Sequence, residues 1–182
     1  MKERKYKEDW VNETRFDDRT GRETRSPVYR GDWFRFPEGA SPRRLSAEAL
    51  LSWAGYIALF VIYFKLNFPG TAVLYVFLPA ALALFPALYW ALGAAALFRA
   101  QERMTRLQKE NGPGRVLRSA AGCTVCSAAA LLGDLVFLIA GHQAEKEWPG
   151  ACILLAAAAV ACAALNRFRA ADRKIVKEEG SL

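Results

Sequence analysis

Four long apolar stretches alternate with charged segments along the chain. The apolar stretches cover residues 45–64, 71–98, 119–141 and 150–165. Each reaches or approaches the roughly 20 apolar residues that a helix needs to cross the hydrocarbon core of a bilayer. None shows the polar face, repeated at helical spacing, that a helix of a soluble bundle would carry. Since backbone groups in lipid must be satisfied within their own segment, the pattern predicts four transmembrane helices.

The predicted fold class is an all-α integral membrane protein with four transmembrane helices. We divide the chain into a charged and aromatic tail over residues 1–44, a four-helix region over residues 45–166 and a basic C-terminal tail over residues 167–182. Pro79 and Pro86 interrupt the second stretch, so a kink or a strong tilt is expected there. The fourth stretch is short and rich in alanine, and small residues let helices approach closely. We therefore expect the fourth helix to pack against the others.

Lysine and arginine residues are distributed very unevenly between the connecting segments. Of the 25, twelve lie in residues 1–44, six in residues 99–118 and five after Leu165, whereas Lys65 and Lys146 stand alone in the other two connectors. Positively charged segments stay on the cytoplasmic side of a membrane. The pattern predicts a plasma membrane protein with the N-terminus, the connector 99–118 and the C-terminus in the cytoplasm. The first 40 residues lack the apolar region of a signal peptide, so we interpret them as a mature tail.

The N-terminal tail contains a pattern typical of β-structure. Two extended runs within residues 10–36 flank a turn-like segment at residues 17–21, which predicts a β-hairpin. Aromatic and arginine residues follow the hairpin: Tyr29, Arg30, Trp33, Phe34, Arg35 and Phe36. This cluster resembles an interfacial anchor, with rings at the level of the lipid headgroups and arginines near phosphates. The alternative is a docking site for a partner protein.

The connector 99–118 is read as a continuation of the second helix into the cytoplasm. Its first part has the composition of a helix, and residues 111–114 form the sequence Asn-Gly-Pro-Gly, which is typical of a helix end. The connectors 65–70 and 142–150 are short and both end in Pro-Gly, a turn signal. The first and second helices, and likewise the third and fourth, are therefore expected to form antiparallel hairpins.

A single carboxylate, Asp134, interrupts the third apolar stretch. A charge at such a depth costs on the order of a few kcal/mol, so Asp134 is expected to be protonated, paired or facing a wet cavity. Candidate partners at comparable depth are Lys65, Tyr63 and Tyr75, and His142 projects on nearly the same helix face. One hypothesis is a polar clamp that fixes helix packing, a second is a proton or ion path from Asp134 to His142, and a third is binding of a partner subunit or ligand.

The cysteines offer a second candidate site. Cys123 and Cys126 form a CxxC pair on one helical face, and Cys162 is predicted at a similar depth on the fourth helix. Three converging thiols suggest redox or metal chemistry. Zinc, however, prefers four ligands, and no histidine or carboxylate is expected at that level, while cysteine is also an ordinary small packing residue. We therefore expect no metal and no cofactor.

The sequence favours a non-enzymatic function. It has no phosphate-binding loop, dinucleotide fingerprint or hydrolase motif, and its basic residues are interleaved with acids in three segments, which argues against nucleic-acid binding. The leading hypothesis is an accessory or scaffold component that contacts the lipid bilayer and either copies of itself or other membrane subunits. One alternative is a small oligomeric transporter or channel that uses Asp134 as a coupling carboxylate. Another is a membrane thiol redox protein that uses Cys123 and Cys126.

Overall fold

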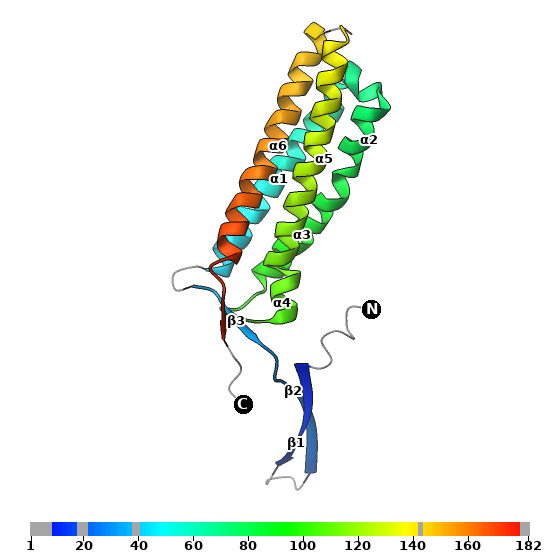
Figure 1. Cartoon of the computed structure of the whole chain (residues 1–182). Coiled ribbons are helices and arrows are strands. Elements are labelled where there is room, and N and C mark those ends of the chain that lie inside the picture. The colour runs from blue at the N-terminus through cyan, green and yellow to red at the C-terminus, as the bar shows by residue number, and fades with distance from the viewer. Residues whose placement is uncertain (1–8, 18–21, 38–40, 142–143, 179–182) are drawn as a thin grey trace.

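A computed structural model describes residues 9–17, 22–37, 41–141 and 144–178 (Figure 1). Its main body is a bundle of long helices: α1 (Pro42–Leu66), α2 (Leu74–Leu82), α3 (Leu84–Phe98), α5 (Pro113–Ile139) and α6 (Ala144–Asp172). With α2 and α3 taken together, the described residues form four helices long and apolar enough to cross a membrane. The predicted helical fold class is confirmed at this level.

The bundle is held together by regularly spaced buried faces. On α5 the buried residues recur every three or four positions: Pro113, Val116, Ala120, Cys123, Ser127, Ala130 and Asp134. On α6 the same spacing joins Glu147, Gly150, Leu154, Ala157, Ala161, Ala164 and Phe168. This spacing is typical of helices that pack side by side with a small crossing angle. α5 packs most extensively against α6, and the buried alanines of α6 form the predicted packing face.

The second span is interrupted where its prolines predict a kink. α2 ends at Leu82 and α3 begins at Leu84, with Pro79 inside α2 and Pro86 in the first turn of α3. Pro86 has no N–H to donate to the carbonyl of Leu82, so the hydrogen-bond ladder of one continuous helix is interrupted at this point. The interruption predicted at the prolines is confirmed, and Figure 1 shows α2 and α3 as successive segments along the same side of the bundle.

Two helices end at positions other than those predicted from the sequence. Residues 150–165 belong to α6, which runs from Ala144 to Asp172 because Pro149 lies inside the helix instead of in a turn before it. Which of its residues cross the membrane stays a prediction. The connector after Phe98 does not continue the second helix. It forms the strand β4 (Arg103–Thr105) and the short helix α4 (Arg106–Asn111), whose first turn is closed by a reciprocal capping box between Thr105 and Gln108.

Pro113 begins the next helix, whereas the helix end predicted at residues 111–114 is found at the end of α4. Pro113 stands in the first turn of α5, where its missing N–H costs nothing because the first N–H groups of a helix have no intrahelical partner. The sequence Asn-Gly-Pro-Gly therefore ends the short helix α4 and begins the long helix α5 within four residues.

Two small sheets lie outside the bundle. The predicted hairpin is confirmed: β1 (Trp10–Asp17) pairs antiparallel with β2 (Arg22–Tyr29). A second sheet has the order β4-β3-β5 and joins β3 (Trp33–Arg35) to β4 and to β5 (Val176–Glu178). It brings together three segments that are far apart in the sequence. We call this end of the bundle the sheet end, and Figure 1 shows β1 and β2 extending away from it.

The opposite end carries the connection between α1 and α2. α1 ends at Asn67, which adopts a left-handed backbone conformation, and the chain then forms the 3-10 turn η2 (Pro69–Ala72). α5 ends and α6 begins at this same end of the bundle (Figure 1). We call it the loop end.

Candidate functional site

Two carboxyl groups are buried together at the loop end. Asp134 from α5 and Glu147 from the first turns of α6 both have fully buried side chains. They meet at Gly70 of η2, where a Cβ atom would lie 2.5 Å from Oδ1 of Asp134 and 2.6 Å from Oε1 of Glu147. The backbone N–H of Gly70 donates a hydrogen bond of 2.7 Å to Oε2 of Glu147. A side chain at residue 70 would therefore require η2 or the two carboxyl groups to shift. We call Asp134 and Glu147 the carboxyl pair.

The carboxyl pair has more acceptor oxygens than donors. Both side-chain oxygens of Asp134 and Oε1 of Glu147 find no hydrogen-bond donor among the described residues. Oδ1 of Asp134 and Oε1 of Glu147 are nevertheless close neighbours, because both lie within 2.6 Å of the same point beside Gly70. Since an ionised carboxylate only accepts, a hydrogen bond between them forms only when one of the two groups carries a proton. The geometry can therefore hold one shared proton between two acids.

Tyr63 completes the site. Its side chain is fully buried on α1, and it is close enough to interact electrostatically with both carboxyl groups. Its hydroxyl has no hydrogen-bond partner in the described parts of the chain. Because a phenol can donate as well as accept, the Tyr63 hydroxyl is a candidate donor to the carboxyl pair. The prediction that Tyr63 is a hydrogen-bond partner of Asp134 stays a prediction.

Among the described residues, neither Lys65 nor Tyr75 forms a hydrogen bond or ion pair with Asp134. The side chain of Lys65 is exposed, and the ion pairs found between described residues do not join it to Asp134. The side chain of Tyr75 is 51% exposed, although its backbone oxygen approaches α5 at Gly133. His142 lies outside the described residues, so the hypothesis of a path from Asp134 to His142 stays a prediction.

Sequence reasoning missed Glu147 as the neighbour of Asp134. The Pro149-Gly150 pair favours a turn, which would place Glu147 in a connector. In the structure, Pro149 and Gly150 are both part of α6. A signal was present: Glu147 precedes Leu154 by seven residues and so continues the buried face of α6. An acidic residue is also favoured in the first turn of a helix, where the helix dipole is positive.

A second polar cluster lies deeper in the bundle. The Tyr56 hydroxyl from α1 lies 2.8 Å from Oγ of Ser127, and it also donates to the carbonyl oxygen of Cys123 at 3.4 Å. The Cys123 thiol in turn contacts the carbonyl oxygen of Ala83 at 3.9 Å. These polar groups are all buried but satisfied, which is what a structural cross-link between helices requires.

The three cysteines of the predicted redox site differ in how far they are buried. Cys123 is buried and Cys126 is half-buried, whereas Cys162 is exposed on α6 and accepts a contact from Asn166 of its own helix. The residues that the structure describes contain no group of three or more His, Cys, Asp or Glu side chains that could hold a metal. The predicted convergence of three thiols is therefore absent, and redox chemistry at Cys123 and Cys126 stays a prediction.

The aromatic segment after the hairpin is built into the sheet end. Phe36 is buried, Arg103 lies over the ring of Trp33, and Lys109 lies over the ring of Phe34. The two arginines of this segment face acidic residues: Arg30 pairs with Glu13 at 2.6 Å, and Arg35 lies 3.8 Å from Glu178. These contacts give the rings and arginines a role within the protein, whereas their predicted contact with lipid headgroups or a partner stays untested.

Tyr29 connects the hairpin to the three-stranded sheet. Its hydroxyl donates to the carbonyl oxygen of Asp32 at 3.0 Å and accepts from the backbone N–H of Arg106 at 3.2 Å. Its ring also makes edge contacts with Trp10 and Trp33. Burial raises the pKa of Tyr29 above its ordinary value, although the hydrogen bond from Arg106 opposes this effect.

Comparisons with known proteins identify no relatives. No protein-family model matches the chain, and neither the curated proteins nor the solved structures give a match.

Proposed function

We propose that the chain is a multi-pass protein of the plasma membrane with both termini in the cytoplasm. Four long apolar helices support membrane insertion. The concentration of lysine and arginine in residues 1–44, residues 99–118 and the C-terminal tail supports a cytoplasmic position for the sheet end. The β4-β3-β5 sheet adds support, because its three strands come from these three segments and so must lie on one side of the bilayer.

Sided labelling tests this orientation. In a variant whose native cysteines are replaced, a single cysteine introduced as Ser26→Cys in the hairpin should react with a membrane-impermeant thiol reagent only after the cells are broken. The matched variant Lys146→Cys, at the loop end, should react in intact cells. The reverse pattern would overturn the orientation, and equal labelling of both positions in intact cells would also contradict it.

We propose further that the protein is a non-enzymatic accessory or scaffold component of a membrane complex. The observation that carries this proposal is the hairpin, which extends from the sheet end as two strands of eight residues each (Figure 1). Within the described residues it belongs to no larger sheet. A two-stranded hairpin is marginal in water, and its open edges can pair with a strand of another chain.

The hairpin also presents a small apolar face. Val11 and Val28 are cross-strand neighbours, and their side chains are 40% and 36% exposed. Cross-strand apolar pairs on one face contribute to binding when a second surface covers them. A scaffold that recruits a partner through this face needs no catalytic site, which agrees with the absence of a predicted enzyme motif.

Purification from the native membrane tests the scaffold function. The tagged protein, extracted in mild detergent, should bring a partner protein in a fixed ratio. The double substitution Val11→Asp and Val28→Asp should abolish this association while the protein still accumulates in the membrane. Asn12→Asp, on the opposite hairpin face, is the matched control and should keep the partner. A homo-oligomer without another subunit, unaffected by the valine substitutions, would contradict the proposal.

A small oligomeric transporter or channel is the second candidate function, and the carboxyl pair favours it. Two buried acids with unpaired oxygens form a site that can bind and release a proton. Buried ionisable residues within membrane helices frequently mark such pathways. In proteoliposomes, Asp134→Asn should abolish a proton flux without reducing the amount of inserted protein. Glu145→Gln, at an exposed position in the same turn as Glu147, should leave the flux unchanged. A wild-type protein without flux would remove this candidate.

A further inference from the structure

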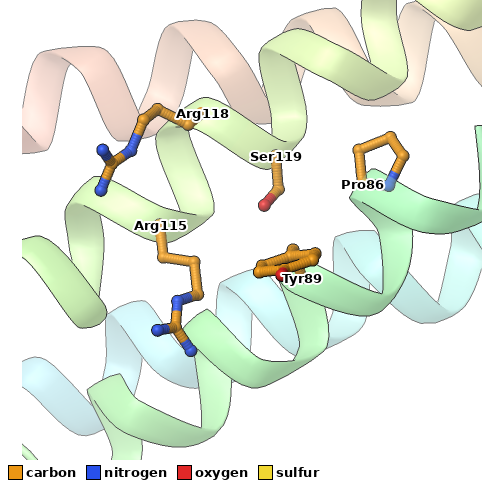
Figure 2. Close-up of a pocket in the computed structure, with 5 residues that line it drawn as sticks. All are labelled: Pro86, Tyr89, Arg115, Arg118 and Ser119. Atoms are coloured by element: carbon orange, nitrogen blue, oxygen red, sulfur yellow. The ribbon is translucent and has the colours of Figure 1, made fainter. Parts of the chain in front are cut away.

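A pocket lies between α3 and α5, on the part of the bundle nearest the sheet end. It has a volume of about 300 Å³ and is lined by Pro86, Tyr89, Arg115, Arg118 and Ser119 (Figure 2). Pro86 and Tyr89 come from α3, and the other three residues come from the first two turns of α5. Neither the carboxyl pair nor the hairpin takes part in this pocket.

Close helix contacts above and below the pocket define its shape. At one contact a Cβ atom on Gly93 of α3 would lie 2.9 Å from the backbone nitrogen of Val116. At the other, a Cβ atom on Gly122 of α5 would lie 3.0 Å from Cβ of Pro86. Between these contacts α5 presents Ser119, a small residue. These contacts hold α3 and α5 close together on either side of the pocket, and side chains of both helices line it.

Two arginines supply a concentrated positive charge. Arg115 donates to Oδ1 of Asn111 at 2.9 Å, and its guanidinium lies 6.0 Å from the centre of the Tyr89 ring. Arg118 donates to the backbone oxygens of Gly114 and Glu110 at 3.1 and 3.2 Å. Neither arginine takes part in the salt bridges found in the ranges that the structure describes.

These contacts orient the two guanidinium groups without neutralising them. A guanidinium has five N–H donors, so each arginine keeps donors that its contacts within the chain do not use. Figure 2 shows the Ser119 hydroxyl pointing into the space between the arginines and Tyr89. The two guanidinium groups extend in different directions in Figure 2, but together with the hydroxyl they give the pocket the types of donor that bind the oxygens of a phosphate.

We propose that this pocket binds the phosphate group of an anionic phospholipid. The apolar surface that continues from it supports a lipid rather than a free phosphate ion: Phe85, Leu88 and Leu92 on α3 are 65%, 61% and 55% exposed. A phosphate held by Arg115 and Arg118 would place the acyl chains along this surface. Basic pockets between membrane helices on the cytoplasmic side are typical sites for anionic headgroups. The inference rests on the proposed membrane orientation and is independent of the scaffold function.

Lipid titration of the purified full-length chain tests the proposal. The protein in detergent is titrated with phosphatidylglycerol or with phosphatidylcholine of identical acyl chains, and native mass spectrometry gives the dissociation constants. The double substitution Arg115→Gln and Arg118→Gln should weaken phosphatidylglycerol binding by roughly tenfold or more, since each basic residue near a headgroup contributes measurably. Arg169→Gln with Arg173→Gln removes the same charge from exposed positions on and just after α6 and should change the affinity less than about twofold.

Two further binding measurements distinguish a lipid phosphate from a free phosphate ion. Inorganic phosphate should not displace phosphatidylglycerol at concentrations far above that of the lipid, and phosphatidylcholine should bind more weakly because its choline cation opposes the two arginines. Displacement by inorganic phosphate would overturn the lipid assignment and indicate a free phosphate site. Equal loss of binding in both double variants, or unchanged binding in the pocket variant, would overturn the site itself. Thermal unfolding of each variant shows whether the fold is retained.

Discussion

Charged and acidic side chains differ in burial and pairing between the two ends of the bundle. At the sheet end, acidic and basic side chains are partly exposed and form ion pairs, such as Glu178 with Arg103 at 2.9 Å and Lys177 with Asp32 at 3.1 Å. At the loop end, the carboxyl pair is fully buried, and no cation of the described residues is paired with it. Since exposed pairs are worth little and buried unsatisfied groups cost much, substitutions at the two ends should differ strongly in effect.

The largest effect is expected from Gly70→Ala. The added methyl group would overlap the oxygens of both Asp134 and Glu147, so η2 or the carboxyl pair must move. We expect a loss of about 1–3 kcal/mol in the free energy of unfolding, because overpacking a buried contact costs that much. Thermal unfolding in detergent measures it. Gly55→Ala is the matched control, since its added Cβ meets nothing within 4 Å. Equal stability of the two variants would contradict the packing of the carboxyl pair around Gly70.

Substitution of Glu147 distinguishes a hydrogen-bonded pair from simple packing. Glu147→Ala removes the acceptor of the Gly70 N–H and leaves that donor buried, at a cost of about 1–3 kcal/mol. Glu147→Gln should cost clearly less, because its amide oxygen can accept from Gly70 while its NH2 group donates to Asp134. The same unfolding assay compares the two variants. If the glutamine variant is as unstable as the alanine variant, Asp134 and Glu147 do not share a proton.

Removal of an ion pair at the sheet end should have a much smaller effect. Glu178 contacts both Arg103 and Arg35, but these side chains are between 32% and 57% exposed. Solvent screening reduces the value of such a pair, so Glu178→Gln should cost about 0.2–1 kcal/mol. The measured cost should fall further as salt concentration rises. A cost as large as that of Glu147→Ala would show that the two ends do not differ as proposed.

The smallest effect concerns the ionisation of Tyr29. Because burial favours its neutral form, the stability that Tyr29 contributes is complete below the ordinary tyrosine pKa of about 10 and is lost as pH rises through the higher folded value. The ultraviolet absorbance of tyrosinate during a pH titration, with Tyr29→Phe subtracted, should show one tyrosine ionising above that ordinary value. If the subtracted curve gives a pKa at or below the ordinary tyrosine value, the buried position of Tyr29 between the hairpin and Arg106 would be contradicted.

The sequence was sufficient to predict the apolar helices, because each is defined by a long local run of residues. The interruption between α2 and α3 was also predictable, since Pro79 and Pro86 act on their own backbone. The hairpin could be identified for the same reason, because its turn and its two strands are neighbours in the chain.

The features that were missed depend on distant contacts or on ambiguous local signals. β3, β4 and β5 have three residues each and form because three remote segments meet, so no periodic pattern marks them. The neighbour of Asp134 was missed because Pro149-Gly150 resembles a turn. The helical continuation of α6 through that pair, and the position of Glu147 on its buried face, are set by packing against α5.

Photo-crosslinking in the native membrane tests the scaffold function most directly. A photoreactive residue is placed at Val11 or Val28 of the hairpin, and a control is placed at Val125, whose side chain is 68% exposed on α5. The account predicts one defined protein partner, crosslinked from both hairpin positions and not from Val125. The scaffold function would be contradicted if the hairpin positions capture no protein and Val125 crosslinks to copies of this chain. That result would favour an oligomeric transporter.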